Sequence, residues 1–384
     1  MKSFTFSIPQ NIVMGEGALK QLPQIAAKIG GKKAYIVSDP VLKQMGTVDA
    51  CVGYLKEAGL ESDEFTETEG NPSVETVEKA TEGFKASGAD FLVALGGGSA
   101  MDVAKAVGVV ATYGGSITEY EGAQKVPGDI VPQIAIPTTA GTGSEVTAFS
   151  VITDHSRNYK LTVFSYKLLP AYVILDPELL ATVPASVAAA CGMDAFIHAM
   201  ESYISVDASP FTEAMSEKAM ELIGANIRRF VANRKDTEAA SAMITGSMLA
   251  GIAFSWARLG DVHAMSHPVS AYYNVPHGVA NSILLPVVTE FNKLTDTGKY
   301  LKIYNYIAPV KAHAHTFDPE MLVEAIRKLN AELGIPATLS AFNPAITDEH
   351  FDAMAEDAMK SGNIAANPRT TTIKDVIAIY KKAL

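Results

Sequence analysis

The chain has 384 residues, of which 48% are hydrophobic and 19% are charged, and its formal net charge is −11. This length predicts two domains, each with a core of its own. The acidic balance argues against a nucleic-acid partner, which requires clustered Lys and Arg.

The first half of the chain alternates short β-rich runs with helical segments. In chain order we predict a strand at 32–39, a helix at 41–59, a weaker strand at 61–67, a helix at 73–88, a strand and glycine turn at 89–99, a helix at 100–112, and a strand and turn at 132–145. Strands separated by helices of this length predict parallel βαβ units with helices on both faces of the sheet.

After about Pro184 the strand pattern ends. Apolar residues then recur with the 3.6-residue period of a helix, in the segments 185–205, 209–233, 238–256, 318–334, 347–362 and 371–384. We therefore predict an α/β domain at 1–184 followed by an all-α domain at 185–384.

An apolar strand runs directly into a glycine turn in FLVALGGGSAMDVAK, residues 91–105. Gly97, Gly98 and Ser99 lie where the next helix begins, so free backbone N–H groups there face an anion such as a diphosphate. The common dinucleotide fingerprint is not matched, because Met101 stands where its third glycine would be. The alternative is a turn that merely needs glycine, but three glycines with a serine favour binding.

Two other features support a nucleotide site in this half. Asp39 ends the strand at 32–39 and is the candidate acid for the ribose, although it precedes the glycine turn instead of following it. Thr138, Thr139 and Thr142 follow a later strand, at the edge of an open α/β sheet where ligands bind. Each feature alone is common in ordinary loops, whereas two such clusters past two strands favour a bound cofactor.

The stretch 262–289 contains no Asp, Glu, Lys or Arg, yet it holds three of the eight histidines. It has the length of a membrane span, but its three prolines and three histidines are disfavoured in a bilayer core. The first ten residues, MKSFTFSIPQ, lack the apolar core of a signal peptide, and two cysteines cannot form a disulfide framework. We expect a soluble, cytoplasmic protein.

The histidines of this stretch are paired at helical spacing. His263 and His267 are four residues apart, as are Asp194 and His198 upstream, so a helix places each pair on one face. Imidazoles and one carboxylate in segments nearly free of other charge indicate a metal site, to which His277 adds a third element. The alternative is a set of buried core histidines. We expect a dry site in which no spare carboxylate weakens the cation as a Lewis acid.

Four segments of the chain resemble motifs of the iron-containing (group III) alcohol dehydrogenases: GGGSAMDVAK, PTTAGTGSEVT, GMDAFIHAMESY and VHAMSHPVSAYYNVPHGVANSILLP. The resemblance runs along essentially the whole chain. It implies a fold similar to dehydroquinate synthase, with an NAD-binding domain at 1–184, a metal-binding and catalytic domain at 185–384, and a homodimer or higher homo-oligomer. It implies that the metal ligands are Asp194, His198, His263 and His277, and that the catalytic, non-ligand histidine near the substrate is His267.

On the cofactor side, the residues assigned to the NAD site are Asp39, Asn71, Gly97, Gly98, Ser99, Asp102, Thr138, Thr139, Thr142 and Lys160. The carboxylate of Asp39 would repel a 2′-phosphate, so NAD(H) is expected over NADP(H). Positions on the substrate side, such as Phe149, Phe254 and Trp256, vary within the family and leave the alcohol undetermined.

The implied reaction is hydride transfer between a small primary alcohol or diol, or its aldehyde, and NAD(H). Four protein ligands and a substrate oxygen need at least five coordination positions, which Fe²⁺ accepts more readily than tetrahedral Zn²⁺, although Zn²⁺ is another expected occupant. The alternatives are a dehydroquinate synthase-like enzyme, which needs Lys and Arg around an anionic substrate, a glycerol dehydrogenase-like enzyme, and a non-catalytic metal- or nucleotide-binding protein.

Overall fold

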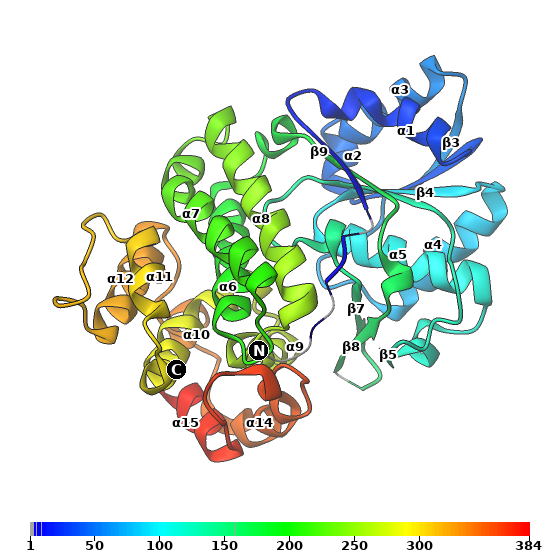
Figure 1. Ribbon diagram of the computed structural model, residues 1–384. Coiled ribbons are helices and arrows are strands. Elements are labelled where there is room, and N and C mark those ends of the chain that lie inside the picture. The colour runs from blue at the N-terminus through cyan, green and yellow to red at the C-terminus, as the bar shows by residue number, and fades with distance from the viewer. Residues whose placement is uncertain (1–3, 5, 9, 158) are drawn as a thin grey trace. The chain divides into compact units, whose positions relative to one another are not determined.

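A computed structural model describes residues 4, 6–8, 10–157 and 159–384 of the chain. The chain forms two compact units, which are an α/β unit at Ser7–Ala181 and a helical unit at Thr182–Leu384 (Figure 1). The described residues before Ser7 belong with the helical unit, where the Phe6 ring lies 5.2 Å from that of Phe211 and 6.0 Å from that of Trp256.

The α/β unit is built on a six-stranded sheet in the order β1-β9-β6-β4-β2-β3, with every neighbouring pair parallel. The strands are β1 (Asn11–Met14), β2 (Lys33–Val37), β3 (Glu61–Phe65), β4 (Phe91–Gly96), β6 (Gln133–Pro137) and β9 (Tyr172–Leu175). The central strands β4 and β6 are buried along their whole length, as expected for apolar strands that are covered on both faces.

Helices cover both faces of this sheet, as the sequence pattern predicts. They are α1 (Leu22–Lys28), α2 (Pro40–Gln44), α3 (Thr47–Glu57), α4 (Val74–Ser87) and α5 (Gly98–Tyr113). Alternate residues of β4 separate the two layers: Val93 packs in the cluster with α1 and α3, whereas Leu92 packs in the cluster with α4 and α5. The predicted single helix at 41–59 is wrong, because the chain breaks at Gly46, whose φ of 79° is a left-handed value that glycine adopts without strain.

A second, three-stranded sheet in the order β5-β8-β7 was not predicted. It consists of β5 (Gly122–Ala123), β7 (Phe149–Asp154) and β8 (Tyr159–Phe164). Strands β7 and β8 pair antiparallel, and the residues of β7 alternate between buried and half-buried, which is the period of a strand with one covered face. Strands β7 and β8 follow the threonine-rich loop in the chain, whereas β5 precedes it.

The helical unit contains no strand among the residues that the structure describes from 182 onward. Its helices are α6 (Ala185–Ile204), α7 (Pro210–Ala232), α8 (Thr237–Ala257), α9 (Asp261–Tyr273), α10 (His277–Asn292), α11 (Lys299–Ile307), α12 (Pro319–Glu332), α13 (Leu339–Phe342), α14 (Phe351–Met359) and α15 (Ile373–Ala383). Helix α8 is apolar and long enough to cross a membrane, but 56% of its most apolar window is buried and it packs against α6 and α7 as a core helix.

Cap residues at several helix starts explain why these helices begin where they do. The Ser209 side chain accepts a hydrogen bond from the Thr212 N–H, and Pro210 occupies the first position of α7. The Thr372 side chain likewise accepts from the Asp375 N–H at the start of α15. Helix α10 begins directly at His277, after Pro276, so its first residue is one of the candidate metal ligands.

Candidate cofactor and metal sites

Three candidate cofactor residues follow three neighbouring strands of the large sheet. Asp39 comes after β2, Gly97 after β4 and Thr138 after β6, and these strands are adjacent and parallel. The Thr138 N–H donates to the Gly96 carbonyl oxygen at 3.0 Å. Gly96 has a φ of 153°, and a methyl group there would lie 2.8 Å from the Ala100 Cβ, so this turn requires glycine. The structure therefore brings these residues to one edge of the sheet, where open α/β folds bind ligands.

The glycine turn and the threonine loop are in direct contact. Gly97 is the N-cap of α5 and Gly98 is its first residue. A methyl group on Gly98 would lie 2.7 Å from the Thr142 Cγ2, and one on Gly97 would lie 3.4 Å from the Thr139 Oγ1. The backbone N–H groups at the start of this helix of 16 residues are oriented to bind an anion.

Asp39 also has a structural role. Its Oδ1 accepts hydrogen bonds from the N–H groups of Val41 and Leu42 at 2.9 and 3.0 Å, and so caps α2. Its Oδ2 lies on the side of the glycine turn, 3.6 Å from where a Gly96 methyl group would be. The assignment of Asp39 to the ribose remains a prediction.

The remaining predicted cofactor residues Asn71, Asp102 and Lys160 are half-buried polar residues of the same α/β unit. The Lys160 Nζ donates to the Asn71 Oδ1 at 2.6 Å, and Asn71 has the left-handed φ of 58°. Burial lowers the pKa of Lys160 to about 8. Burial raises the pKa of Asp102 to about 6, although the positive charge of Lys105 and the hydrogen bond that Asp102 accepts from Ser144 oppose the rise.

Lys105 was missed by the sequence analysis. Its Nζ is buried and donates to the carbonyl oxygens of Ser144, Thr147 and Phe149 at 2.6, 2.9 and 2.8 Å. It thus fastens the segment after the threonine loop to α5, and burial lowers its pKa to about 8. The sequence feature that could have indicated this role is a single lysine within the mostly apolar helical run 100–110.

In the helical unit, three candidate metal ligands from three helices converge. Asp194 lies on α6, His263 on α9 and His277 on α10, and each offers one ligand atom within 4.8 Å of the others. The Asp194 Oδ1 is 3.5 Å from the His263 Nε2 and 3.8 Å from the His277 Nε2. Asp194 and His263 are 3% and 1% exposed.

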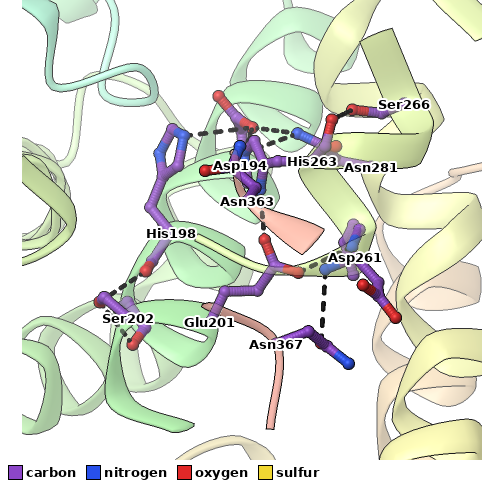
Figure 2. Close-up of polar contacts among 12 residues, drawn as sticks. Asp194, His198, Glu201, Ser202, Asp261, His263, Ser266, Asn281, Asn363 and Asn367 are labelled. Atoms are coloured by element: carbon purple, nitrogen blue, oxygen red, sulfur yellow. Dashed lines mark hydrogen bonds and ion pairs between the residues drawn. The ribbon is translucent and has the colours of Figure 1, made fainter. Parts of the chain in front are cut away.

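The two remaining predicted residues lie beside this group. The His198 Nε2 is 4.0 Å from the Asp194 Oδ1, and the His198 ring stacks on that of His263 with centroids 4.5 Å apart (Figure 2). The His267 ring lies 5.3 Å from that of His277, on the same helix as His263. All five residues named by the sequence pattern are therefore neighbours.

The carboxylates of Asp194 and Glu201 favour positive charge on the histidines beside them. Burial alone would raise the pKa of Asp194, yet His198, His277 and His263 hold it well below its usual range. Burial lowers the pKa of His263, but its hydrogen bonds to Asp194 and Glu201 and their charges raise it to about 9. Among the described residues, the ion-pair partners of Asp194 and Glu201 are all histidines.

Asn281 is a further residue that the sequence analysis missed. Its Nδ2 lies 2.6 Å from the Asp194 Oδ1 and 3.1 Å from the Nε2 atoms of both His263 and His277. Within the described part of the chain, its fully buried Oδ1 has no hydrogen-bond partner. The amide group thus lies where one carboxylate oxygen and two imidazole nitrogens converge, which are the ligand types that a divalent cation takes, and it leaves its own oxygen unsatisfied. The residues therefore fit a divalent metal.

The expectation that no spare carboxylate lies near the site is wrong. The Glu201 Oε2 is 2.6 Å from the His263 Nδ1, and Glu201 is 3% exposed. Asp261 is fully buried at the start of α9, and burial raises its pKa to about 7 despite the hydrogen bond from Thr371. The stretch 262–289 is free of charge in sequence, but α6 brings a carboxylate against it in space.

Comparison with known proteins agrees with this chemistry. The family model for iron-containing alcohol dehydrogenase matches residues 9–177, and that for the C-terminal part of the Fe-containing alcohol dehydrogenase family matches residues 188–384. The chain is 37% identical to the NAD-dependent methanol dehydrogenase of Bacillus methanolicus over 380 residues, which is 99% of each chain. It is also 37% identical to the 1,3-propanediol dehydrogenase of Citrobacter freundii over 385 residues, 100% of this chain and 99% of the other.

A solved structure shares the fold. The crystal structure of a 1,3-propanediol oxidoreductase superposes with a TM-score of 0.94 at 36% identity and covers 100% of both chains. The family resemblance in the glycine turn, the threonine loop and the histidine segments is thus confirmed along the whole length. The chain belongs to the iron-containing alcohol dehydrogenase family.

Proposed function

We propose that this protein transfers hydride between a small primary alcohol or diol, or its aldehyde, and NAD(H), and that it requires a divalent metal, with Fe²⁺ the most active. The observation that carries this proposal is the convergence of one carboxylate and two imidazoles within 4.8 Å from three helices, with Asp194 and His263 buried and His277 half-buried. The names of two relatives, a methanol dehydrogenase and a 1,3-propanediol dehydrogenase, support the substrate class.

The proposed ligands of the metal are the four residues Asp194, His198, His263 and His277. A divalent cation held by them would supply Lewis acidity that lowers the pKa of an alcohol group. We assign to His267 the transfer of the alcohol proton toward solvent, because it is a half-buried imidazole beside His277 and imidazole is the side chain that most often carries protons in catalysis. Asp194 and His263 are buried, whereas His277 and His267 are half-buried, so the group is open to a substrate on the side of these two histidines.

The proposed cofactor domain is 1–184, and the proposed metal-binding and catalytic domain is 185–384. The N–H groups of Gly97, Gly98 and Ser99 would bind the diphosphate at the start of α5. The threonines of the loop after β6 pack on that turn. The carboxylate of Asp39 would accept hydrogen bonds from the adenosine ribose. We also assign Asn71, Asp102 and Lys160 to the NAD site.

The direct test is spectrophotometric. The purified protein, loaded anaerobically with Fe²⁺, should form NADH from at least one member of a panel that runs from methanol to butanol and includes the propanediols, and it should reduce lactaldehyde or another short aldehyde in reverse. NADH formation that does not depend on added metal would contradict the proposal, and so would a protein that binds NAD and metal but turns over no alcohol.

Cofactor preference provides a separate prediction. The Asp39 carboxylate would repel a 2′-phosphate, so kcat/KM should favour NAD over NADP, and Asp39→Gly should narrow that ratio by at least tenfold. Glycine is a suitable replacement because it costs only a few tenths of a kcal/mol as an N-cap, so α2 should persist. Metal content should not change. A wild-type protein that prefers NADP would overturn the assignment.

We further propose that the protein is a cytoplasmic homodimer. The small number of cysteines, Cys51 and Cys191, supports a reducing compartment. We infer the homodimer from the family to which the chain belongs. Sedimentation analysis of the NAD-bound protein tests it, and a single species at the mass of one chain, 40.7 kDa, would contradict it.

A further inference from the structure

Glu201 joins two of the helices that carry the candidate ligands. It lies on α6, seven residues after Asp194 and three after His198, so the three side chains share one face of that helix. Its two carboxylate oxygens have different partners: Oε2 is 2.6 Å from the His263 Nδ1, and Oε1 accepts from the Val262 N–H at 2.8 Å (Figure 2).

The contact with Glu201 determines which nitrogen of the neutral His263 ring carries the proton. A carboxylate can only accept, so the His263 Nδ1 must carry a proton. In the neutral ring the lone pair is then on Nε2, the atom that faces Asp194 at 3.5 Å and receives the Asn281 Nδ2 at 3.1 Å. Stacking against the His198 ring at 4.5 Å restricts rotation of the imidazole. A metal needs this tautomer and this ring orientation.

A purely structural role for Glu201 would explain only half of these contacts. The hydrogen bond from Val262 ties α6 to the first turn of α9, and a methyl group on Gly260 would lie 2.9 Å from the Glu201 Oε1, so the backbone packs closely there. Such a tie requires one acceptor oxygen. It does not require the second oxygen to be directed at the imidazole nitrogen opposite the candidate ligand atom.

We propose that Glu201 is a positioning residue of the metal site, which holds His263 in the tautomer and orientation that present Nε2 to the ion. Its negative charge, added to that of Asp194, also balances a divalent cation. The inference rests on the proposed metal-binding function of this site. It assigns no contact between Glu201 and the metal.

The test is Glu201→Gln, measured as Co²⁺ affinity by the visible absorption of the bound ion. Glutamine keeps the size but presents one NH₂ group, so either His263 or Val262 faces a donor instead of an acceptor. Loss of such an outer partner costs about 10–100-fold in metal affinity, and we expect a decrease in that range, with a changed absorption spectrum. The matched control is Ser202→Ala, which removes a buried hydroxyl of the same helix that contacts Ser216 and the backbone carbonyl oxygen of His198 but no candidate ligand atom, and which should leave Co²⁺ affinity unchanged.

A second measurement needs no variant. Nitrogen NMR of histidine-labelled wild-type protein loaded with Zn²⁺ should show His263 protonated at Nδ1 and bound to the metal through Nε2. A wild-type protein that binds no Co²⁺ or Zn²⁺ at Asp194 would overturn the proposed function together with this inference. Wild-type binding with undiminished affinity in folded Glu201→Gln, or a His263 protonated at Nε2, would overturn the inference alone.

Discussion

The His263→Ala variant is expected to lose both bound metal and turnover. His263 is buried, its Nε2 is 3.5 Å from the Asp194 Oδ1, and its other nitrogen is held by Glu201. Alanine removes a proposed ligand and leaves the Asp194 carboxylate with less compensation for burial. The decrease in metal affinity should exceed the roughly 10–100-fold that loss of an outer partner costs. Elemental analysis after dialysis and a turnover assay in excess Fe²⁺ measure the two effects.

His267→Ala is the matched control, because it removes an imidazole one helical turn away on the same helix. General acid–base catalysis contributes about 10²–10⁴-fold, so turnover should decrease within that range while the metal content stays at the wild-type level. Equal metal loss in the two variants would contradict the division of roles between ligand and proton carrier.

The second large effect is expected from Gly278→Ala, at the point where α10 packs on α6. A methyl group there would lie 2.4 Å from the Ala190 carbonyl oxygen, and this backbone atom cannot move away cheaply. Overpacking of this kind costs about 1–3 kcal/mol of unfolding free energy. Because His277 is the preceding residue, displacement of α10 should also move its Nε2 away from Asp194. We expect a lower midpoint in urea and weaker metal binding in the folded fraction.

The Gly224→Ala variant is the control that separates loss of stability from weaker metal binding. A methyl group on Gly224 would lie 2.4 Å from the Tyr306 carbonyl oxygen, so α7 is equally crowded, but no candidate ligand is next to it. This variant should be destabilised to a similar extent with its metal affinity preserved. Equal weakening of metal binding in both glycine variants would show that general loss of packing, not the position of α10, is responsible.

Much of the fold could be predicted because local patterns and tertiary environment agree. Apolar runs such as 91–96 predict strands, and the structure buries them on both faces. The prediction fails where one residue decides the outcome, as at Gly46, which divides a continuous helical pattern in two. The pairing of β1 with β9, in register from Asn11 opposite Tyr172, joins segments that are far apart in the chain, and no local pattern specifies such a pair.

The small sheet was predictable only in part: in β8 the buried residues Leu161 and Val163 alternate with partly exposed neighbours, whereas β7 buries the polar Ser150 and Asp154, so its sequence shows no hydrophobic alternation. Glu201, which shares a helical face with Asp194 and His198, and Asn281, which is four residues after His277, were also predictable in part. What the pattern could not provide is which faces meet. The contact of Glu201 with His263 depends on how α6 packs against α9, and local spacing does not determine that packing.

The most direct test of the account is metal reconstitution. The protein is stripped of metal anaerobically, reloaded with Fe²⁺, Zn²⁺, Mn²⁺ or Co²⁺, and assayed for alcohol-dependent NADH formation at equal metal occupancy. We predict that the Fe²⁺ form is the fastest, that Zn²⁺ occupies the site with little activity, and that air inactivates the iron form. A Zn²⁺ form that is faster than the Fe²⁺ form and indifferent to air would contradict the assignment of four protein ligands around a ferrous ion.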